Sequence, residues 1–105
     1  MPERRVHPRI PCALTVTVEG LDEPVRLTTR DVSLGGVFLY SQAPRLLFAE
    51  VDLTLHAPQH HLRARGRVVH HLPEVGFGVQ FLSLQPGDDD RLAVFLAQVE
   101  ESAAR

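Results

Sequence analysis

Three arginines stand close together near the start of the chain, ahead of the first segment with strand-like alternation. Residues 1–10 contain Arg4, Arg5 and Arg9 and a single glutamate, which gives this segment a net charge of +2. A guanidinium group offers a planar fork of donors and a face for stacking, and both suit a compact anionic ligand. Pro8 is incompatible with a helix interior, so we expect the arginines on an extended arm. The alternative is a solvated, frayed terminus.

A second segment with chemical potential, Asp31–Gly36, breaks the alternation between two expected strands. Asp31 and Ser33 are two residues apart, so in extended geometry their oxygen atoms can point to the same side. Gly36 allows a positive φ or a close approach of another molecule to the backbone. Guanine nucleotides fit these groups. A carboxylate accepts hydrogen bonds from the N1–H and N2–H₂ edge of guanine. Arginines can donate to O6 and N7 of guanine, stack on the purine ring and bind the phosphates.

The other reactive side chains give little support for catalysis or for a metal site. The chain has no G-x-S-x-G nucleophile elbow, and Cys12 follows a proline with no feature that would activate its thiol. Neighbours on a strand point to opposite faces, so neither His60-His61 nor His70-His71 can place both rings on one metal ion. A surface zinc site shared across a hairpin is the alternative. We therefore expect no enzymatic activity, no metal and no cofactor.

Period-two alternation of apolar residues places these groups on strands. The expected strands cover residues 13–19, 25–29, 37–40, 51–56, 62–71 and 75–81. Short strands at this spacing, joined by tight turns, predict a small antiparallel barrel or sandwich.

Two further features belong to this scaffold. Arg63, Arg65 and Arg67 share the outer face of one strand, where we expect them to be solvated and to discourage edge pairing. After residue 88 the apolar period becomes that of an amphipathic helix, and the carboxylates of Asp88–Asp90 are placed to cap its free N–H groups.

Length and composition limit the possible classes of protein. The chain has 105 residues, 44% of them hydrophobic and 23% charged, which predicts one ordinary globular domain. A net charge of −2 argues against general nucleic-acid binding. A single cysteine, short apolar runs and a charged beginning predict no internal disulfide, no membrane span and no secretory signal, hence a cytoplasmic protein.

Together, the two segments resemble the PilZ domain, the bacterial receptor module for cyclic di-GMP. That family carries RxxxR on an N-terminal arm and [D/N]xSxxG between two barrel strands. Arg5-Val6-His7-Pro8-Arg9 matches the first motif, and Asp31-Val32-Ser33-Leu34-Gly35-Gly36 matches the second. Gly76–Phe81 is similar to the family's final strand. The resemblance implies an all-β fold, a six-stranded antiparallel β-barrel with a C-terminal α-helix.

The resemblance divides the single domain into a ligand-binding arm (1–12), a barrel (13–82) and a helix (88–103). It implies a second-messenger receptor that relays cyclic di-GMP binding by conformational change. The residues it assigns to the ligand are Arg4, Arg5, Arg9, Asp31, Ser33 and Gly36. An arginine directly before RxxxR resembles the family variants that bind an intercalated dimer of the ligand.

Two alternatives belong to other functional classes. The first is an interaction adaptor on the same fold that does not bind nucleotide and presents Leu46-Leu47-Phe48 or the helix to a motility or secretion partner. The second, a small OB-like nucleic-acid binder, would need exposed aromatic residues for stacking, and most aromatics here occupy core-facing positions.

Overall fold

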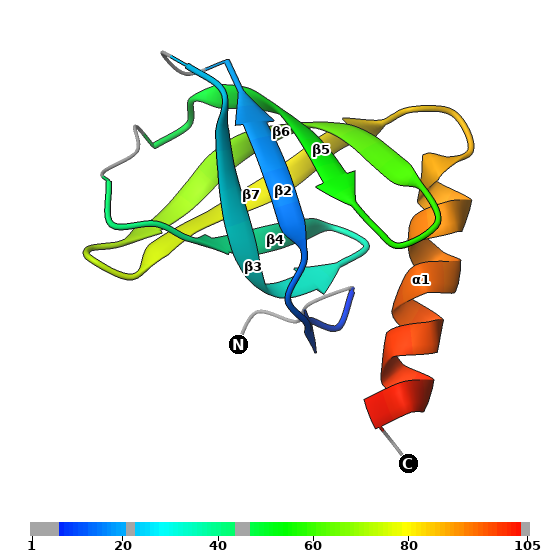
Figure 1. Ribbon diagram of the computed structural model, residues 1–105. Helices are drawn as coiled ribbons and strands as arrows, with labels where there is room; N and C mark the ends of the chain where they lie inside the picture. The colour runs from blue at the N-terminus through cyan, green and yellow to red at the C-terminus, as the bar shows by residue number, and fades with distance from the viewer. Residues whose placement is uncertain (1–6, 21–22, 44–46, 104–105) are drawn as a thin grey trace, which may run out of the picture.

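Six strands close into an antiparallel barrel, and a single helix packs beside it (Figure 1). The computed structural model describes residues 7–20, 23–43 and 47–103. The elements are β1 (Ile10–Pro11), β2 (Thr15–Glu19), β3 (Val25–Ser33), β4 (Gly36–Tyr40), β5 (Glu50–His56), β6 (His61–Leu72), β7 (Gly76–Leu84) and α1 (Asp88–Ala103). Around the ring the strands follow the order β2-β3-β4-β7-β6-β5, and β5 pairs with β2. This confirms the expected barrel with a C-terminal helix, to which the short strand β1 is an addition.

The core of the barrel follows from the alternation in the sequence. In β2, Val16 and Val18 are fully buried, while the residues at both ends of the strand are exposed. The helix adds its apolar stripe to the same core through Leu92 and Leu96. In the part of the chain that the structure describes, no helix combines the length and apolar character needed to cross a membrane.

The outward positions of β6 carry arginines, as the alternation predicts. Arg65 donates to Glu50 at 3.1 Å and to Asp52 at 2.9 Å, and Arg67 donates to Glu50 at 3.3 Å. All four side chains are substantially exposed, so these pairs contribute little to stability. They pair Arg65 and Arg67 with acidic side chains of the neighbouring strand β5.

One extra residue in β3 changes which face its side chains occupy. The pairing of β3 with β4 shifts between Thr29 and Asp31, which leaves Arg30 as the additional residue of a β-bulge. Because side chains alternate strictly along a strand, one inserted residue moves all that follow to the opposite face. Thr29 before the bulge and Val32 after it are both buried, at an odd spacing that an unbroken strand would not allow.

The bulge also corrects the sequence analysis of this segment. Residues 31–36 were expected to lie between two strands, but β3 continues through Ser33. Val32 is fully buried in the core, so Asp31 and Ser33 point to the outer face of the barrel. The break in alternation therefore marked a change of face within one strand.

Two glycines on the outer face of β7 have different structural roles. A Cβ on Gly76 would lie 2.0 Å from the carbonyl oxygen of Leu39 on β4, so the close approach of these strands requires glycine. A Cβ on Gly78 would make only ordinary contacts, the nearest at 3.5 Å from Cβ of His70. Gly78 is buried, but the pairing of β7 with its neighbours does not require glycine at this position.

A buried carboxylate fastens the start of α1 to the barrel. Asp88 is 6% exposed and accepts hydrogen bonds from the backbone N–H of Arg63 on β6 (2.9 Å) and from Nη1 of Arg91 (2.8 Å). The sequence analysis expected this acid to cap amides of the helix itself, and it instead serves a strand amide. Burial alone would raise the pKa of Asp88, but the hydrogen bonds from Arg63 and Arg91 outweigh it and hold the pKa below its usual value.

The two glycines of β7 give a matched test of this packing. We expect Gly76→Ala to lower the free energy of unfolding by about 1–3 kcal/mol, because its Cβ collides with backbone that cannot move aside freely. Gly78→Ala should change it by less than about 1 kcal/mol. Urea denaturation of the two variants measures both values. If Gly76→Ala and Gly78→Ala had the same free energy of unfolding, the different roles assigned to the two glycines would be contradicted.

The Asp88 contacts predict a pH dependence. A carboxyl whose pKa is lowered by folding stabilises the native state above its unfolded pKa, about 3.9, and this stabilisation is lost as pH falls through the folded pKa. We expect Asp88→Asn to be less stable than the unmodified chain by about 1–2 kcal/mol at pH 7, with the difference shrinking below pH of about 4. Asp89→Asn, at an exposed position, is the control. A difference that stays constant down to acid pH would show that the charge contributes nothing.

Candidate functional site

A groove of about 790 Å³ crosses the outer face of the barrel, along β7 and between the end of β3 and β6. The predicted site residues that the structure describes all line it, and they are Arg9, Asp31, Ser33 and Gly36. Arg4 and Arg5 lie outside the described residues. Gly78 forms part of the floor, with the side chains of His70 and Gln80 beside it. The two sequence motifs therefore meet at one concave surface.

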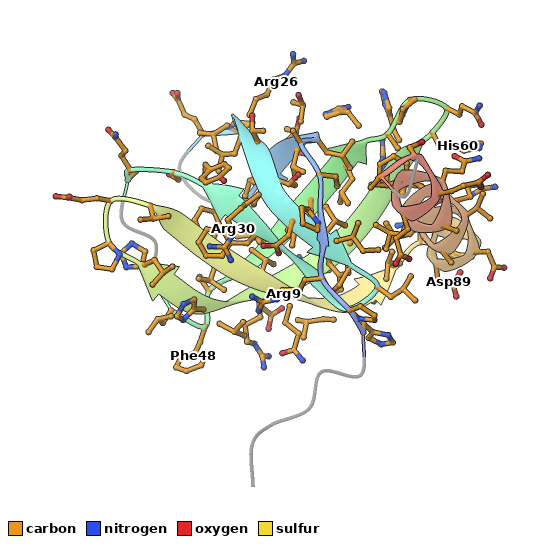
Figure 2. The ribbon with its side chains drawn as sticks, turned by 90° about the horizontal axis from the view of Figure 1, so that it is seen from below. Arg9, Arg26, Arg30, Phe48, His60 and Asp89 are labelled. Atoms are coloured by element: carbon orange, nitrogen blue, oxygen red, sulfur yellow. The ribbon has the colours of Figure 1, made fainter. Side chains whose placement is uncertain are left out.

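The arm reaches this groove by pairing with β3. Ile10 is opposite Val32 and Pro11 is opposite Asp31. Ile10 is buried against the core, so the arm is anchored immediately after Arg9. Arg9 itself is exposed and makes no hydrogen bond or ion pair with another residue that the structure describes (Figure 2). Its guanidinium is available to a ligand.

A threonine bridges the interruption between β1 and β2. Oγ1 of Thr29 accepts a hydrogen bond from the N–H of Leu14 at 2.8 Å and donates to the carbonyl oxygen of Cys12 at 2.7 Å. This buried hydroxyl satisfies backbone groups that would otherwise lack partners and fixes the path of the arm. Burial raises the pKa of the Cys12 thiol, so the cysteine stays protonated near neutral pH and is a poor nucleophile.

The start of the described arm also touches the β3–β4 hairpin. A Cβ on Gly35 would lie 3.2 Å from Cδ2 of His7, so the imidazole packs closely over this glycine. His7 and Arg9 both line the groove. The arm thus contributes one wall of the site, and the hairpin contributes another.

Ser33 holds the hairpin in shape. Its Oγ accepts hydrogen bonds from the backbone N–H groups of Gly35 (3.0 Å) and Gly36 (3.1 Å), and it donates a longer one to the carbonyl oxygen of Gly36 (3.4 Å). Ser33 is 8% exposed. Much of the hydrogen-bonding capacity that the sequence analysis reserved for a ligand is therefore used within the turn.

The reason for glycine at position 36 also differs from the expected one. The backbone φ of Gly36 is not positive, and a Cβ there would lie 2.2 Å from the carbonyl oxygen of Val79 on β7. The close approach is between two strands of the same barrel, where β4 pairs with β7. Gly36 is required for barrel closure at the edge of the groove.

Sequence reasoning missed Arg30, which the bulge brings to the same face as Asp31. Nε of Arg30 donates to Oδ2 of Asp31 at 2.9 Å, and Cζ of Arg30 lies 3.9 Å from the ring centroid of Phe38 (Figure 2). Phe38 lies on the outer face and is buried there, an exception to the expectation that most aromatic residues face the core. Adjacent residues of a regular strand point apart, so only the failed alternation between Thr29 and Val32 could have revealed this pair.

The groove therefore holds the groups for binding both an anion and an array of hydrogen-bond donors. Arg9 supplies an unpaired positive charge. Asp31, 8% exposed, supplies a carboxylate whose Oδ1 receives no hydrogen bond from any residue in the described ranges. Among the described residues, no group of three or more histidine, cysteine or acidic side chains is arranged to hold a metal ion.

Comparisons with known proteins agree with this geometry. The family model of the PilZ domain matches residues 3–98. The solved structure of MotI/DgrA, described as an inhibitor of motility from Bacillus subtilis, matches with a TM-score of 0.84 at 15% sequence identity. The match covers 99% of this chain and 55% of that one, so the present chain spans about half the length of that protein. Comparison with curated protein sequences gives no match.

The turn contacts of Ser33 predict a loss of stability without any ligand. In Ser33→Ala the partly buried backbone N–H groups of Gly35 and Gly36 lose their acceptor, so the free energy of unfolding should fall by about 1–2 kcal/mol. Ser41→Ala is the control, because Oγ of Ser41 accepts only one exposed bond, from Ala43 at 3.2 Å. Chemical denaturation of both variants is the measurement. If Ser33→Ala is as stable as Ser41→Ala, the hydroxyl is free to serve a ligand.

Proposed function

The chain belongs to the PilZ domain family, and we propose that it is a bacterial receptor for cyclic di-GMP that has no catalytic activity of its own. One observation carries the proposal: the arm and the β3–β4 hairpin meet in one groove, which Arg9 and Asp31 both line. PilZ domains are binding and regulatory domains. Nothing in the chemistry of the groove requires a reaction of the ligand.

The groups in the groove match the two halves of such a ligand. Asp31 can accept from the N1–H and N2–H₂ donors of a guanine. Arg9, together with Arg4 and Arg5 of the arm, can hold the two phosphates through charge-assisted, bidentate hydrogen bonds. Ser33 and Gly36 contribute by fixing the hairpin on which Asp31 is displayed.

Relay of the signal would follow from the position of the arm. His7, Pro8 and Arg9 are exposed, so a ligand bridging the arm and the groove would add contacts that hold this part of the arm in place. The ordered arm and ligand would form a new surface for a protein partner in the bacterial cytoplasm. The structural neighbour named as a motility inhibitor supports a partner of this kind.

An adaptor that does not bind nucleotide is the second candidate. Leu47 is 45% exposed and Phe48 is 69% exposed, and Phe48 has a φ of 67°, which is uncommon for an aromatic residue. A large exposed side chain on a strained backbone is typical of a contact surface. Leu46, the third residue of this hypothesis, lies outside the described residues. The adaptor is favoured only if the chain fails to bind cyclic di-GMP.

Arginine variants test the receptor. Arg9→Ala and Arg5→Ala should each weaken cyclic di-GMP binding by about 30- to 5,000-fold, because each removes one partner of a charged hydrogen-bonded pair in the complex. Arg63→Ala should leave the affinity nearly unchanged, since Arg63 is exposed and lies outside the groove. Isothermal titration calorimetry gives the affinities, with GTP and linear pGpG as control ligands.

The same titration gives the number of ligands per chain. With Arg4 beside the motif we expect two cyclic di-GMP molecules at saturation, and Arg4→Leu should shift the ratio toward one without abolishing binding. An endpoint at one equivalent for the unmodified chain would remove Arg4 from the site. Equal losses in Arg5→Ala, Arg9→Ala and Arg63→Ala would mean that the groove is not the binding site.

A further inference from the structure

The bulge in β3 places an arginine and a carboxylate side by side on the outer face of the barrel. Arg30 donates from Nε to Oδ2 of Asp31, and Cζ of Arg30 lies over the ring of Phe38, the pairing partner of Asp31. Asp31 lines the groove, and Arg30 is bonded to this carboxylate without lining the groove itself. The side chain of Arg30 is 36% exposed and that of Asp31 is 12% exposed, so the pair is held in place but remains accessible from outside.

Most of the donor capacity of Arg30 is unused. A guanidinium has five N–H donors, and the contact with Asp31 uses the one on Nε. Neither terminal nitrogen donates to another residue within the ranges that the structure describes. Cζ of Arg30 lies over the ring of Phe38, 3.9 Å from its centroid, which holds the guanidinium against the barrel. Among the described residues, the two terminal NH₂ groups therefore have no hydrogen-bond partner.

The pair presents donors next to an acceptor, which is the complement of a guanine edge. Guanine carries the acceptor O6 beside the donors N1–H and N2–H₂, whereas adenine carries a donor where guanine has O6. We propose that Arg30 is the specificity-determining residue for the base: it donates from Nη to O6 of guanine while Asp31 accepts from N1–H and N2–H₂. This inference rests on the proposed function. A base without the O6 acceptor leaves these donors unpaired in the complex, which costs affinity.

The test replaces O6 of the ligand and, separately, the Arg30 side chain of the protein. The probes are cyclic di-GMP and its analogue with 6-thioguanine bases, which keeps both phosphates, N1–H and N2–H₂ but has a weakly accepting sulfur in place of O6. Arg30→Met keeps an unbranched side chain over Phe38 and removes every donor. Arg26→Met is the matched control, because Arg26 stands on the same strand, exposed and away from the groove (Figure 2).

We expect the unmodified chain and Arg26→Met to bind cyclic di-GMP about 10- to 100-fold more tightly than the thio analogue. Arg30→Met should bind both ligands with equal affinity, close to that of the unmodified chain for the thio analogue. The inference is overturned if the unmodified chain does not discriminate between the ligands, or if Arg30→Met retains the discrimination.

A second variant guards against misfolding of the first. Arg30→Leu also removes every donor, with a different side-chain shape over Phe38, so the discrimination should again be lost. Full discrimination by this variant would also overturn the inference. If the unmodified chain binds no cyclic di-GMP, the proposed function itself fails. If it binds cyclic di-GMP and discrimination does not depend on Arg30, only the present inference fails.

Discussion

The β-bulge at Arg30 determines which side chains of β3 face the core and which face the surface of the barrel. Without the extra residue, strict alternation would turn Val32 to the solvent and direct Asp31 and Ser33 into the core. An unpaired carboxylate inside a barrel filled with valine and leucine would be strongly unfavourable. The bulge lets Val32 remain fully buried while its two polar neighbours face outward. One inserted residue thus reconciles a hydrophobic core with a polar site on the same strand.

Closure of the barrel depends on the same region. Gly36 on β4 and Gly76 on β7 stand where these strands approach too closely for a Cβ. Ser33 fixes the hairpin that leads into β4. Residues of the second motif therefore serve the fold directly, and a loss of binding in their variants cannot be attributed to ligand contacts until the stability has been measured. Arg9 and Arg30, both at the surface, separate binding from folding more cleanly.

The period of the apolar residues predicted the six barrel strands and the helix, because most strands bury one face, but it missed β1 and the continuation of β3 through Ser33. Arg9, Asp31, Ser33 and Gly36, which the two motifs singled out, line one groove, and their role in ligand binding stays a prediction. The structure added the bulge, Arg30 and the strand contact of Asp88, which depend on pairing between residues distant in sequence. A single sequence does not encode register directly. A positive φ at Gly36 was wrong, and the contact with Val79 that requires glycine there was missed for the same cause, since Val79 lies far along the chain.

The closed ring also limits the ways in which another protein can attach. Among the described residues, each strand of the barrel has a neighbour on both sides, and the outer side of β1 is the open edge. That edge is two residues long and contains Pro11, which has no N–H to donate. Proteins often bind peptides or aggregate by adding a strand to an open sheet edge. The short edge of β1 offers almost no backbone groups for such pairing. A partner protein therefore has to recognise this molecule through its side chains.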